Sequence, residues 1–278
     1  MSKPRVTGLW IYPIKSCRGI SLQEMEIGPT GPVHDRQWMI VDEQNQFITL
    51  RSEPKLSQIT TELTKQELVL RFNKLEFKIN FKREREESEI VMVWKNRVFA
   101  GIEADPINTA LSEYLGYPVR LVRYQSESAR SLGLSGTAVS QNVMFADSKP
   151  ILLVNEASIQ DLNLKLQSQN LNESKIERFR GNLIIDGLPA FTEDEAQSIK
   201  IKNVEFAKPS LCSRCPIVTQ SVETGLVTSK ETLITLAEYR KLSGSKVMFG
   251  VYWTPSQLGK ICVGDEVDFS FEKSSSKK

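Results

Sequence analysis

The chain has 278 residues, of which 40% are hydrophobic and 25% charged, as in soluble globular proteins, and it is long enough for one large domain or two ordinary ones. Its 36 Lys and Arg residues against 34 Asp and Glu give a formal net charge of +2 at pH 7. This balance provides no general field to attract nucleic acid or anionic lipid, so any anion binding is expected to be local.

The N-terminus and the cysteines indicate a cytoplasmic protein without a membrane partner. Residues 1–5 are short and polar, and a strand-like stretch follows at once, which leaves no room for a signal peptide, a transit helix or a transmembrane anchor. Four cysteines in so long a chain do not form a disulfide framework. A four-cysteine zinc site would require Cys17 and Cys262 to converge on Cys212 and Cys215, and the single histidine, His34, restricts any histidine-based site to one residue.

The first half of the chain is predicted to consist mainly of short β-strands. Apolar and polar residues alternate in these stretches, and polar turns separate them. Tight hairpin turns are expected at Asn73-Lys74 and Lys95-Asn96. One helix is expected, with Asp105 as its N-cap, Pro106 in its first turn and Gly116 at its end. The expected strands cover residues 8–12, 36–42, 47–50, 67–72, 75–81, 89–94 and 98–102.

The second half begins with a serine-rich stretch, 125–140, that is predicted to be a loop or hinge between two domains. A buried strand then leads into a helix capped by Asn155. Arg178 and Arg180, two positions apart, would both face a cleft if the stretch 178–182 is extended, and a solvated strand entry is the alternative. Further strands are expected at 151–154, 183–187, 199–201, 204–207, 248–253 and 266–271. These patterns predict an α+β, mostly β fold, with domains at 1–124 and 125–272 and a disordered tail at 273–278.

The most reactive stretch lies in the last quarter of the chain, where Cys212 and Cys215 stand three residues apart with Lys208 and Arg214 nearby. Neighbouring cations favour the thiolate, which is the form that attacks electrophiles and binds soft metals. The run 216–219 is predicted to be extended, so the pair lacks the helix N-terminus that activates thioredoxin-type dithiols. Packing of both side chains in a core stays open as an alternative.

Cations and a hydroxyl also stand at the ends of predicted strands. Lys15 and Ser16 follow the first strand, and Asp35-Arg36 precedes the next one. Ammonium groups and guanidinium forks at such positions hold phosphate or a polar heterocycle. Together with Arg180 and the two thiols, they predict one pocket that binds an anionic cofactor and presents a sulfur atom to it.

Several ordered motifs carry a resemblance to a known family. They are LWIYPIKSC at 9–17, DRQW at 35–38, RSEPKL at 51–56, EASIQDLN at 156–163, FRGN at 179–182, CSRC at 212–215 and LGKICVGD at 258–265. On these motifs the chain resembles, over nearly its whole length, the MOSC-domain proteins with an N-terminal MOSC β-barrel, such as the mitochondrial amidoxime reducing component and its bacterial relatives. The resemblance implies an N-terminal β-barrel-like domain, a C-terminal MOSC β-barrel with a few helices, and a cofactor in the cleft between them.

The cofactor that this resemblance implies is the molybdenum cofactor, a pterin dithiolene that holds molybdenum, with one protein cysteine as a further sulfur ligand. By motif position, Cys215 is the expected metal ligand and catalytic residue, and Cys212 is a neighbour. The residues expected to hold the pterin and its phosphate are Lys15, Ser16, Arg36, Ser148, Arg180, Asn182 and Ser213. Lys149 departs from the small polar residue that is usual beside Ser148.

Relatives of this type reduce N-hydroxylated compounds, namely amidoximes, hydroxylamines and N-hydroxylated bases, with two electrons at molybdenum. The resemblance therefore implies a molybdenum-dependent oxidoreductase and a separate electron-donor protein of flavin, iron–sulfur or haem type, because the chain lacks the ferredoxin-like domain of some bacterial relatives. The alternative is a molybdenum-cofactor carrier or a persulfide sulfur-transfer protein without reductase turnover. A binding module that has lost the metal is disfavoured, because the whole set of cations and thiols is present.

Overall fold

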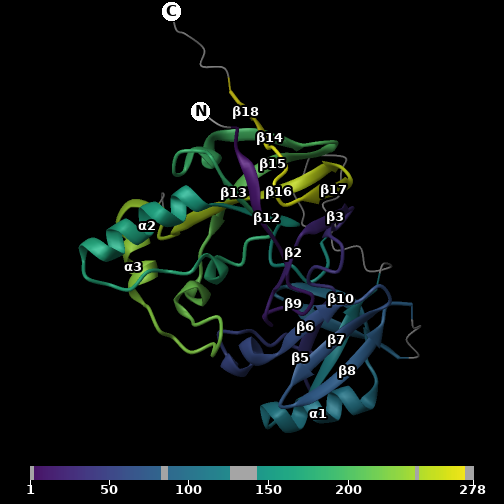
Figure 1. Ribbon diagram of the computed structural model, residues 1–278. Helices are drawn as coiled ribbons and strands as arrows, with labels where there is room; N and C mark the ends of the chain where they lie inside the picture. The colour runs from purple at the N-terminus through teal and green to yellow at the C-terminus, as the bar shows by residue number, and fades with distance from the viewer. Residues whose placement is uncertain (1–2, 83–86, 126–142, 242–243, 273–278) are drawn as a thin grey trace, which may run out of the picture.

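The computed structural model describes residues 3–82, 87–125, 143–241 and 244–272. These residues form two lobes, and the first and the last described strands both lie in the larger one (Figure 1). The described part contains 18 strands and three α-helices, which confirms the predicted α+β, mostly β class. The predicted loop beyond residue 125 and the predicted tail at 273–278 lie outside the described residues.

The larger lobe is built on an eight-stranded sheet in the order β18-β14-β15-β16-β12-β13-β1-β2. A small sheet, β17-β3-β4, adds Met25, Ile27 and Ile261 to the same buried core as Leu9, Leu153 and Trp253. The strands are β1 (Arg5–Ile11), β2 (Ile20–Leu22), β3 (Glu24–Gly28), β4 (Gly31–Pro32), β12 (Ile151–Asn155), β13 (Leu183–Asp186), β14 (Ala196–Ile201), β15 (Val204–Ser213), β16 (Met248–Gln257), β17 (Gly259–Cys262) and β18 (Asp268–Phe271).

The first four strands of the chain belong to this larger lobe, and the smaller lobe is formed by residues that come after them. β1 alternates buried and accessible positions and pairs antiparallel with β13, with Leu9 opposite Leu183. Its apolar residues Val6, Leu9 and Ile11 are fully buried, which holds the strand in place. Consequently the segment that follows β1 is delivered to the junction of the two lobes.

Two helices cover the outer face of the large sheet (Figure 1). β12 and β13 are parallel and are joined through α2 (Glu156–Ser168), and α3 (Glu231–Tyr239) packs beside α2. The Asn155 side chain accepts a 3.1 Å hydrogen bond from the Ala157 N–H, which confirms the predicted cap.

The smaller lobe combines two antiparallel sheets with one helix. The sheets have the orders β5-β11-β10-β9 and β6-β7-β8, and they share a core with α1. The elements are β5 (Trp38–Asp42), β6 (Thr60–Leu63), β7 (Glu67–Phe72), β8 (Leu75–Asn80), β9 (Ser88–Val93), β10 (Asn96–Ile102), α1 (Asp105–Leu115) and β11 (Val119–Tyr124).

Of the two hairpin turns predicted in this lobe, one is confirmed and the other is shifted by one residue. Asn73 and Lys74 have φ of 46° and 65°, as a two-residue hairpin turn requires, so this prediction is confirmed. The second turn consists of Trp94 and Lys95, because Asn96 pairs with Val93, so the prediction of Lys95-Asn96 was wrong by one residue.

The ends of α1 were predicted with one error. Gly116 ends the helix in the left-handed conformation at φ 92°, as expected. Asp105 is the first helical residue rather than the N-cap, and the capping position, Ala104, makes no side-chain bond. The Asp105 carboxylate still favours the helix start through the dipole.

Four short 3-10 helices connect the strands in the part of the chain that the structure describes: η1 (Pro54–Gln58), η2 (Ile176–Phe179), η3 (Thr192–Glu195) and η4 (Pro216–Thr219). None of the helices in the described ranges has the length and apolar character that crossing a membrane requires.

Candidate functional site

A cavity of about 350 Å³ lies at the junction of the two lobes. This volume falls within the range of roughly 300–1,000 Å³ that is usual for small-molecule sites. All eight residues that the family resemblance assigned to the metal or the pterin line it, although they are up to 200 positions apart in the chain. They are Lys15, Ser16, Arg36, Ser148, Arg180, Asn182, Ser213 and Cys215.

Cys215 lies where the chain leaves the large sheet. Strand β15 ends at Ser213, and the Arg214 N–H then donates to the Val247 carbonyl at 2.8 Å, which anchors the turn. Cys215 is the N-cap of η4 and remains partly exposed. The run 216–219 was predicted to be extended, which is wrong: Pro216 presets φ and the Thr219 hydroxyl donates to the Pro216 carbonyl at 2.7 Å, which closes a 3-10 turn.

Cys212 has a different environment from Cys215. Its side chain is only 1% exposed and packs in the cluster that contains Phe179 and Phe249. Arg214 Nη1 lies 3.0 Å from Cys212 Sγ, and Arg214 Nη2 donates to the Phe179 carbonyl at 2.7 Å. The Arg214 guanidinium therefore hydrogen-bonds the buried sulfur of Cys212. The more accessible sulfur at the cavity is that of Cys215.

Two guanidinium groups stack on the ring of Tyr12. The Cζ atoms of Arg36 and Arg180 lie 4.3 Å and 4.1 Å from the ring centroid. Arg180 also donates from Nη1 to the Cys17 carbonyl at 2.9 Å. Gly19 is required beneath this ring, because a Cβ there would lie 2.5 Å from a Tyr12 ring carbon. Cation–π contact and backbone anchoring thus fix both guanidinium groups at the cavity wall.

The backbone at this wall does not meet the condition under which Arg178 and Arg180 would face one cleft. The stretch 178–182 is not extended, because η2 ends at Phe179 and Arg180 adopts the left-handed conformation at φ 52°. Ser16 and Arg36 share that conformation, at φ 69° and 49°. Such residues cost about 1–3 kcal/mol each and persist where tertiary contacts impose them, often at functional sites. Arg178 consequently points away from this cavity and lines a second one.

Two cations at the cavity are paired with carboxylates. Asp35 is 5% exposed, accepts from the Tyr12 N–H at 2.8 Å, and both of its carboxylate oxygens accept from Arg36 Nη1, at 2.7 and 2.6 Å. Lys15 is paired with Asp147. Burial opposes ionisation of Asp147, but the Lys15 ammonium and a hydrogen bond from the Trp94 indole lower its pKa to about 2. The Lys15–Asp147 pair is therefore ionised at neutral pH, whereas burial raises the pKa of Asp35 and the Arg36 cation opposes this shift.

The side chain of Asn182 is hydrogen-bonded to the backbone of two strands. Its Nδ2 donates to the Trp10 carbonyl at 3.1 Å, and its Oδ1 accepts from the Leu152 N–H at 3.2 Å. The side chain is 2% exposed and ties β1 to β12 at the cavity wall. These contacts explain why an amide follows Gly181 here, and they make Asn182 a positioning residue for the wall.

The sequence analysis missed several lining residues, namely Thr49, Arg51, Trp94, Asp147 and Tyr252. Trp94 is the most prominent because it is 44% exposed, its ring lies 5.0 Å from the Arg51 guanidinium, and its Nε1 donates to Asp147 at 2.9 Å. The tight turn that places it has φ of 58° at Trp94 itself. A tryptophan in a hairpin turn was the available signal.

Two other candidate groups do not line this cavity. His34 stacks on Phe81 at 4.1 Å between ring centroids. Cys17 is buried, and burial raises its pKa to about 12 despite the nearby Arg180 cation, so its thiol stays protonated.

The lining chemistry fits an anionic cofactor with a soft metal. Six cationic side chains, those of Lys15, Arg36, Arg51, Lys149, Arg180 and Arg214, line the cavity together with one carboxylate, Asp147, among the residues described. Within the same residues, no group of three or more His, Cys, Asp or Glu side chains is arranged to hold a metal ion. A metal here would take one thiolate from Cys215 and its other ligands from a cofactor, and the surplus of cations suits a phosphate.

Comparison with known proteins agrees with this architecture. Residues 3–118 match the MOSC N-terminal beta barrel domain, and residues 140–268 match the MOSC domain. Mitochondrial amidoxime reducing component 2 of Rattus norvegicus is 32% identical over 283 residues, which cover 94% of this chain and 82% of that protein. Mitochondrial amidoxime-reducing component 1 of Homo sapiens is 30% identical over 282 residues, with the same coverage.

A second group of relatives is longer. The molybdenum cofactor sulfurase of Arabidopsis thaliana is 31% identical over 264 residues, which cover 86% of this chain and 32% of that protein. Two domain models match most of the chain, and the identity to the rat protein is 32% across most of both chains. This chain therefore belongs to the family of MOSC-domain proteins with an N-terminal MOSC β-barrel domain, which includes the mitochondrial amidoxime reducing components.

Proposed function

We propose that this protein is a molybdenum-cofactor-dependent oxidoreductase that reduces N-hydroxylated compounds, such as amidoximes, hydroxylamines and N-hydroxylated bases, with electrons from a separate donor protein. The observation that carries the proposal is the convergence of one accessible thiol, Cys215, with six cations around a single cavity. The names of the curated relatives support the same reaction class. The cytoplasmic location expected from the cysteine usage stays a prediction.

The residues that would hold the cofactor divide by chemistry. Cys215 would bind molybdenum, because a thiolate is a soft ligand. Arg36, Arg180 and Lys15 would neutralise the phosphate and the pterin oxygens, and Ser16, Ser148 and Ser213 would donate or accept hydrogen bonds at the rim of the cavity. When bound, the cofactor supplies two-electron redox chemistry, while the protein supplies orientation and charge.

The protein's own contribution is preorganisation. Asp35 and the Tyr12 ring lock Arg36 in place before any ligand arrives, so its charge does not need to reorient on binding. The Asp147 carboxylate is ionised and paired, so it is not a proton donor at neutral pH. Burial raises the pKa of Tyr252, which also interacts with Cys212, so its phenol keeps its proton and its Oη is a hydrogen-bond donor at the cavity wall.

The test combines metal analysis with a turnover assay. The full-length protein is purified from cells that make the cofactor, its molybdenum and pterin are measured, and reduction of benzamidoxime by dithionite-reduced viologen is followed. One molybdenum per chain with turnover is the expected result. Arg36→Ala should lower the pterin content, whereas the exposed Arg97→Ala is the matched control. Absence of molybdenum from the wild-type protein would refute the proposal. A full pterin content in Arg36→Ala would refute the role assigned to Arg36 in holding the cofactor.

A second candidate, a cofactor carrier or persulfide sulfur-transfer protein, is favoured by two observations. Cys215 is accessible from the cavity, and the chain is similar to about a third of a molybdenum cofactor sulfurase. In this case the purified protein would hold molybdenum, or carry a persulfide on Cys215 that mass spectrometry detects, but benzamidoxime would not be reduced.

A further inference from the structure

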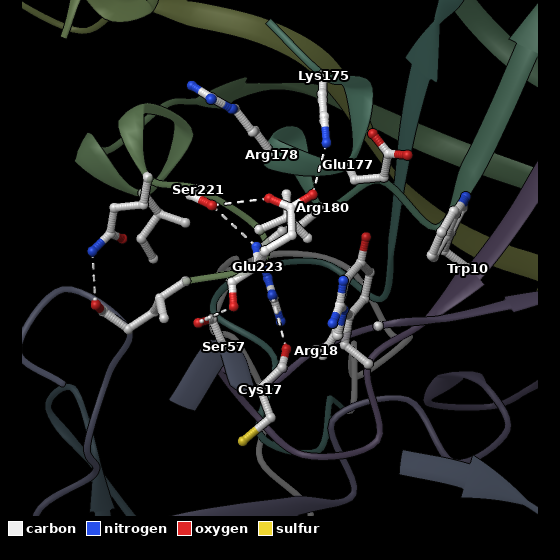
Figure 2. Close-up of a pocket in the computed structure, with 16 residues that line it drawn as sticks. Trp10, Cys17, Arg18, Ser57, Lys175, Glu177, Arg178, Arg180, Ser221 and Glu223 are labelled. Atoms are coloured by element: carbon white, nitrogen blue, oxygen red, sulfur yellow. Dashed lines mark hydrogen bonds and ion pairs between the residues drawn. The ribbon is translucent and has the colours of Figure 1, made fainter. Parts of the chain in front are cut away.

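A second, smaller pocket of about 130 Å³ lies on the other side of Arg180 from the large cavity. The two cavities share only Arg180 and Ile217 among the described lining residues. Its walls come from the segment after β1, from η1 and η2, and from the loop that follows η4 (Figure 2). We infer that this pocket is a second binding site, for a small organic monoanion with an apolar body.

The loop that closes the pocket, residues 220–225, is held against the smaller lobe by several bonds. Gln220 Nε2 donates to the Leu50 carbonyl at 2.9 Å, and the Ser57 hydroxyl donates to the Glu223 carbonyl at 3.3 Å. Gly225 packs on the Pro54 carbonyl so closely that a Cβ would lie 2.2 Å from its oxygen. The pocket is thus formed without a ligand, which lowers the entropic cost of binding.

Most charges around the pocket already have partners. Lys175 reaches across to Glu223 at 2.7 Å, and Arg180 is bound to the Cys17 carbonyl, as Figure 2 shows. Arg178 donates from Nη2 to the Thr228 hydroxyl at 3.0 Å, whereas its Nε and Nη1 are buried and have no hydrogen-bond partner among the described residues. Of the four cationic side chains that line the pocket, Lys175 and Arg180 are therefore paired and Arg178 is paired only in part.

The fourth cation, Arg18, has no side-chain hydrogen bond or ion pair within the described part of the chain, although it is half-buried. The ionisable lining residues comprise four cations and two carboxylates, Glu177 and Glu223, so the wall is net positive. A guanidinium with five free donors in such a wall recognises a carboxylate through a bidentate pair.

The rest of the lining selects the body of the ligand. Trp10, Leu50, Ile217 and Val222 are apolar, and a cavity of about 150 Å³ is known to accommodate benzene, so the pocket has room for about six non-hydrogen atoms. Cys17 also lines the pocket, but burial raises its pKa to about 12, so binding is non-covalent. The ligand class is therefore a short-chain carboxylate rather than an inorganic anion.

The test measures binding of butyrate to the purified full-length protein by saturation-transfer NMR titration. Butyrate should bind saturably, and butyramide and formate, which lack the charge and the apolar chain respectively, should each bind at least ten-fold more weakly. Arg18→Gln should weaken butyrate binding at least ten-fold, Arg18→Lys should retain part of it, and the exposed Arg97→Gln should not change it.

Circular dichroism of each variant distinguishes loss of the site from loss of folding. Equal butyrate affinity in wild type and Arg18→Gln would overturn the inference, as would non-saturable binding or equal binding of butyramide. Because the readout needs neither molybdenum nor turnover, failure here is distinct from failure of the proposed oxidoreductase function.

Discussion

Replacing Cys212 and Cys215 separately by alanine should produce opposite defects. Cys212 is 1% exposed and receives a hydrogen bond from Arg214 at 3.0 Å. Removing its sulfur leaves a cavity at least the size of a methyl group, which costs about 1 kcal/mol. It also leaves a buried guanidinium donor unpaired, which costs about 1–3 kcal/mol. Together these terms predict that Cys212→Ala lowers the free energy of unfolding by about 2–4 kcal/mol.

Cys215 is partly exposed, and no hydrogen bond holds its side chain in the described structure. Cys215→Ala should therefore change the free energy of unfolding by less than about 0.5 kcal/mol. The same substitution removes the accessible thiol among the described residues that line the cavity, so it should abolish turnover and lower the molybdenum content. Cys212→Ala should retain molybdenum while it is folded.

The assay measures urea unfolding of the cofactor-free variants and molybdenum per folded chain in the variants isolated from cofactor-producing cells. Cys17→Ala serves as the control for loss of a buried thiol outside the large cavity. Full molybdenum retention in Cys215→Ala would refute the assignment of this thiol. If Cys212→Ala and Cys215→Ala lose molybdenum equally and neither loses stability, the assignment of Cys212 as a packing residue and Cys215 as the metal ligand is refuted.

Three further predictions follow from the cavity wall. Asp35→Asn leaves a buried guanidinium without its anion and should lower the free energy of unfolding by about 3 kcal/mol. The same change at exposed Asp268 should cost less than about 0.5 kcal/mol, and equal losses would contradict the buried pair. Since Lys15 and a hydrogen bond lower the pKa of Asp147 to about 2, this pair's stabilisation should be complete above about pH 4 and be lost as pH falls through about 2. An NMR titration of the Asp147 carboxyl carbon with a midpoint near 4 would disprove this. Under the proposed function, Trp94→Ala should raise KM for benzamidoxime roughly 3- to 10-fold by removing an exposed stacking surface, whereas Trp94→Phe should stay near wild type, and an unchanged KM in Trp94→Ala would exclude the contact.

Much of this molecule could be predicted locally. Alternating apolar residues and tight-turn residues such as Asn73-Lys74 specify strands and hairpins, because side-chain period and turn dihedrals depend on neighbours in the chain. The Asn155 cap likewise needs only the next two residues. Lys15, Ser16, Arg36, Arg180 and Cys215 could be picked out because charged, hydroxyl or thiol groups stand beside predicted strands, whereas Ser148, Asn182 and Ser213 were named through the family resemblance.

Other features depended on contacts between distant segments. The left-handed turn at Arg180 arises because its side chain reaches the Cys17 carbonyl and the Tyr12 ring, 163 and 168 positions away. The sequence therefore determined which chemical groups this protein carries and the strands that bear them. Only the tertiary structure decided which cysteine is accessible, which cations already have partners, and that a second pocket exists, because burial and pairing are set by residues far apart in the chain.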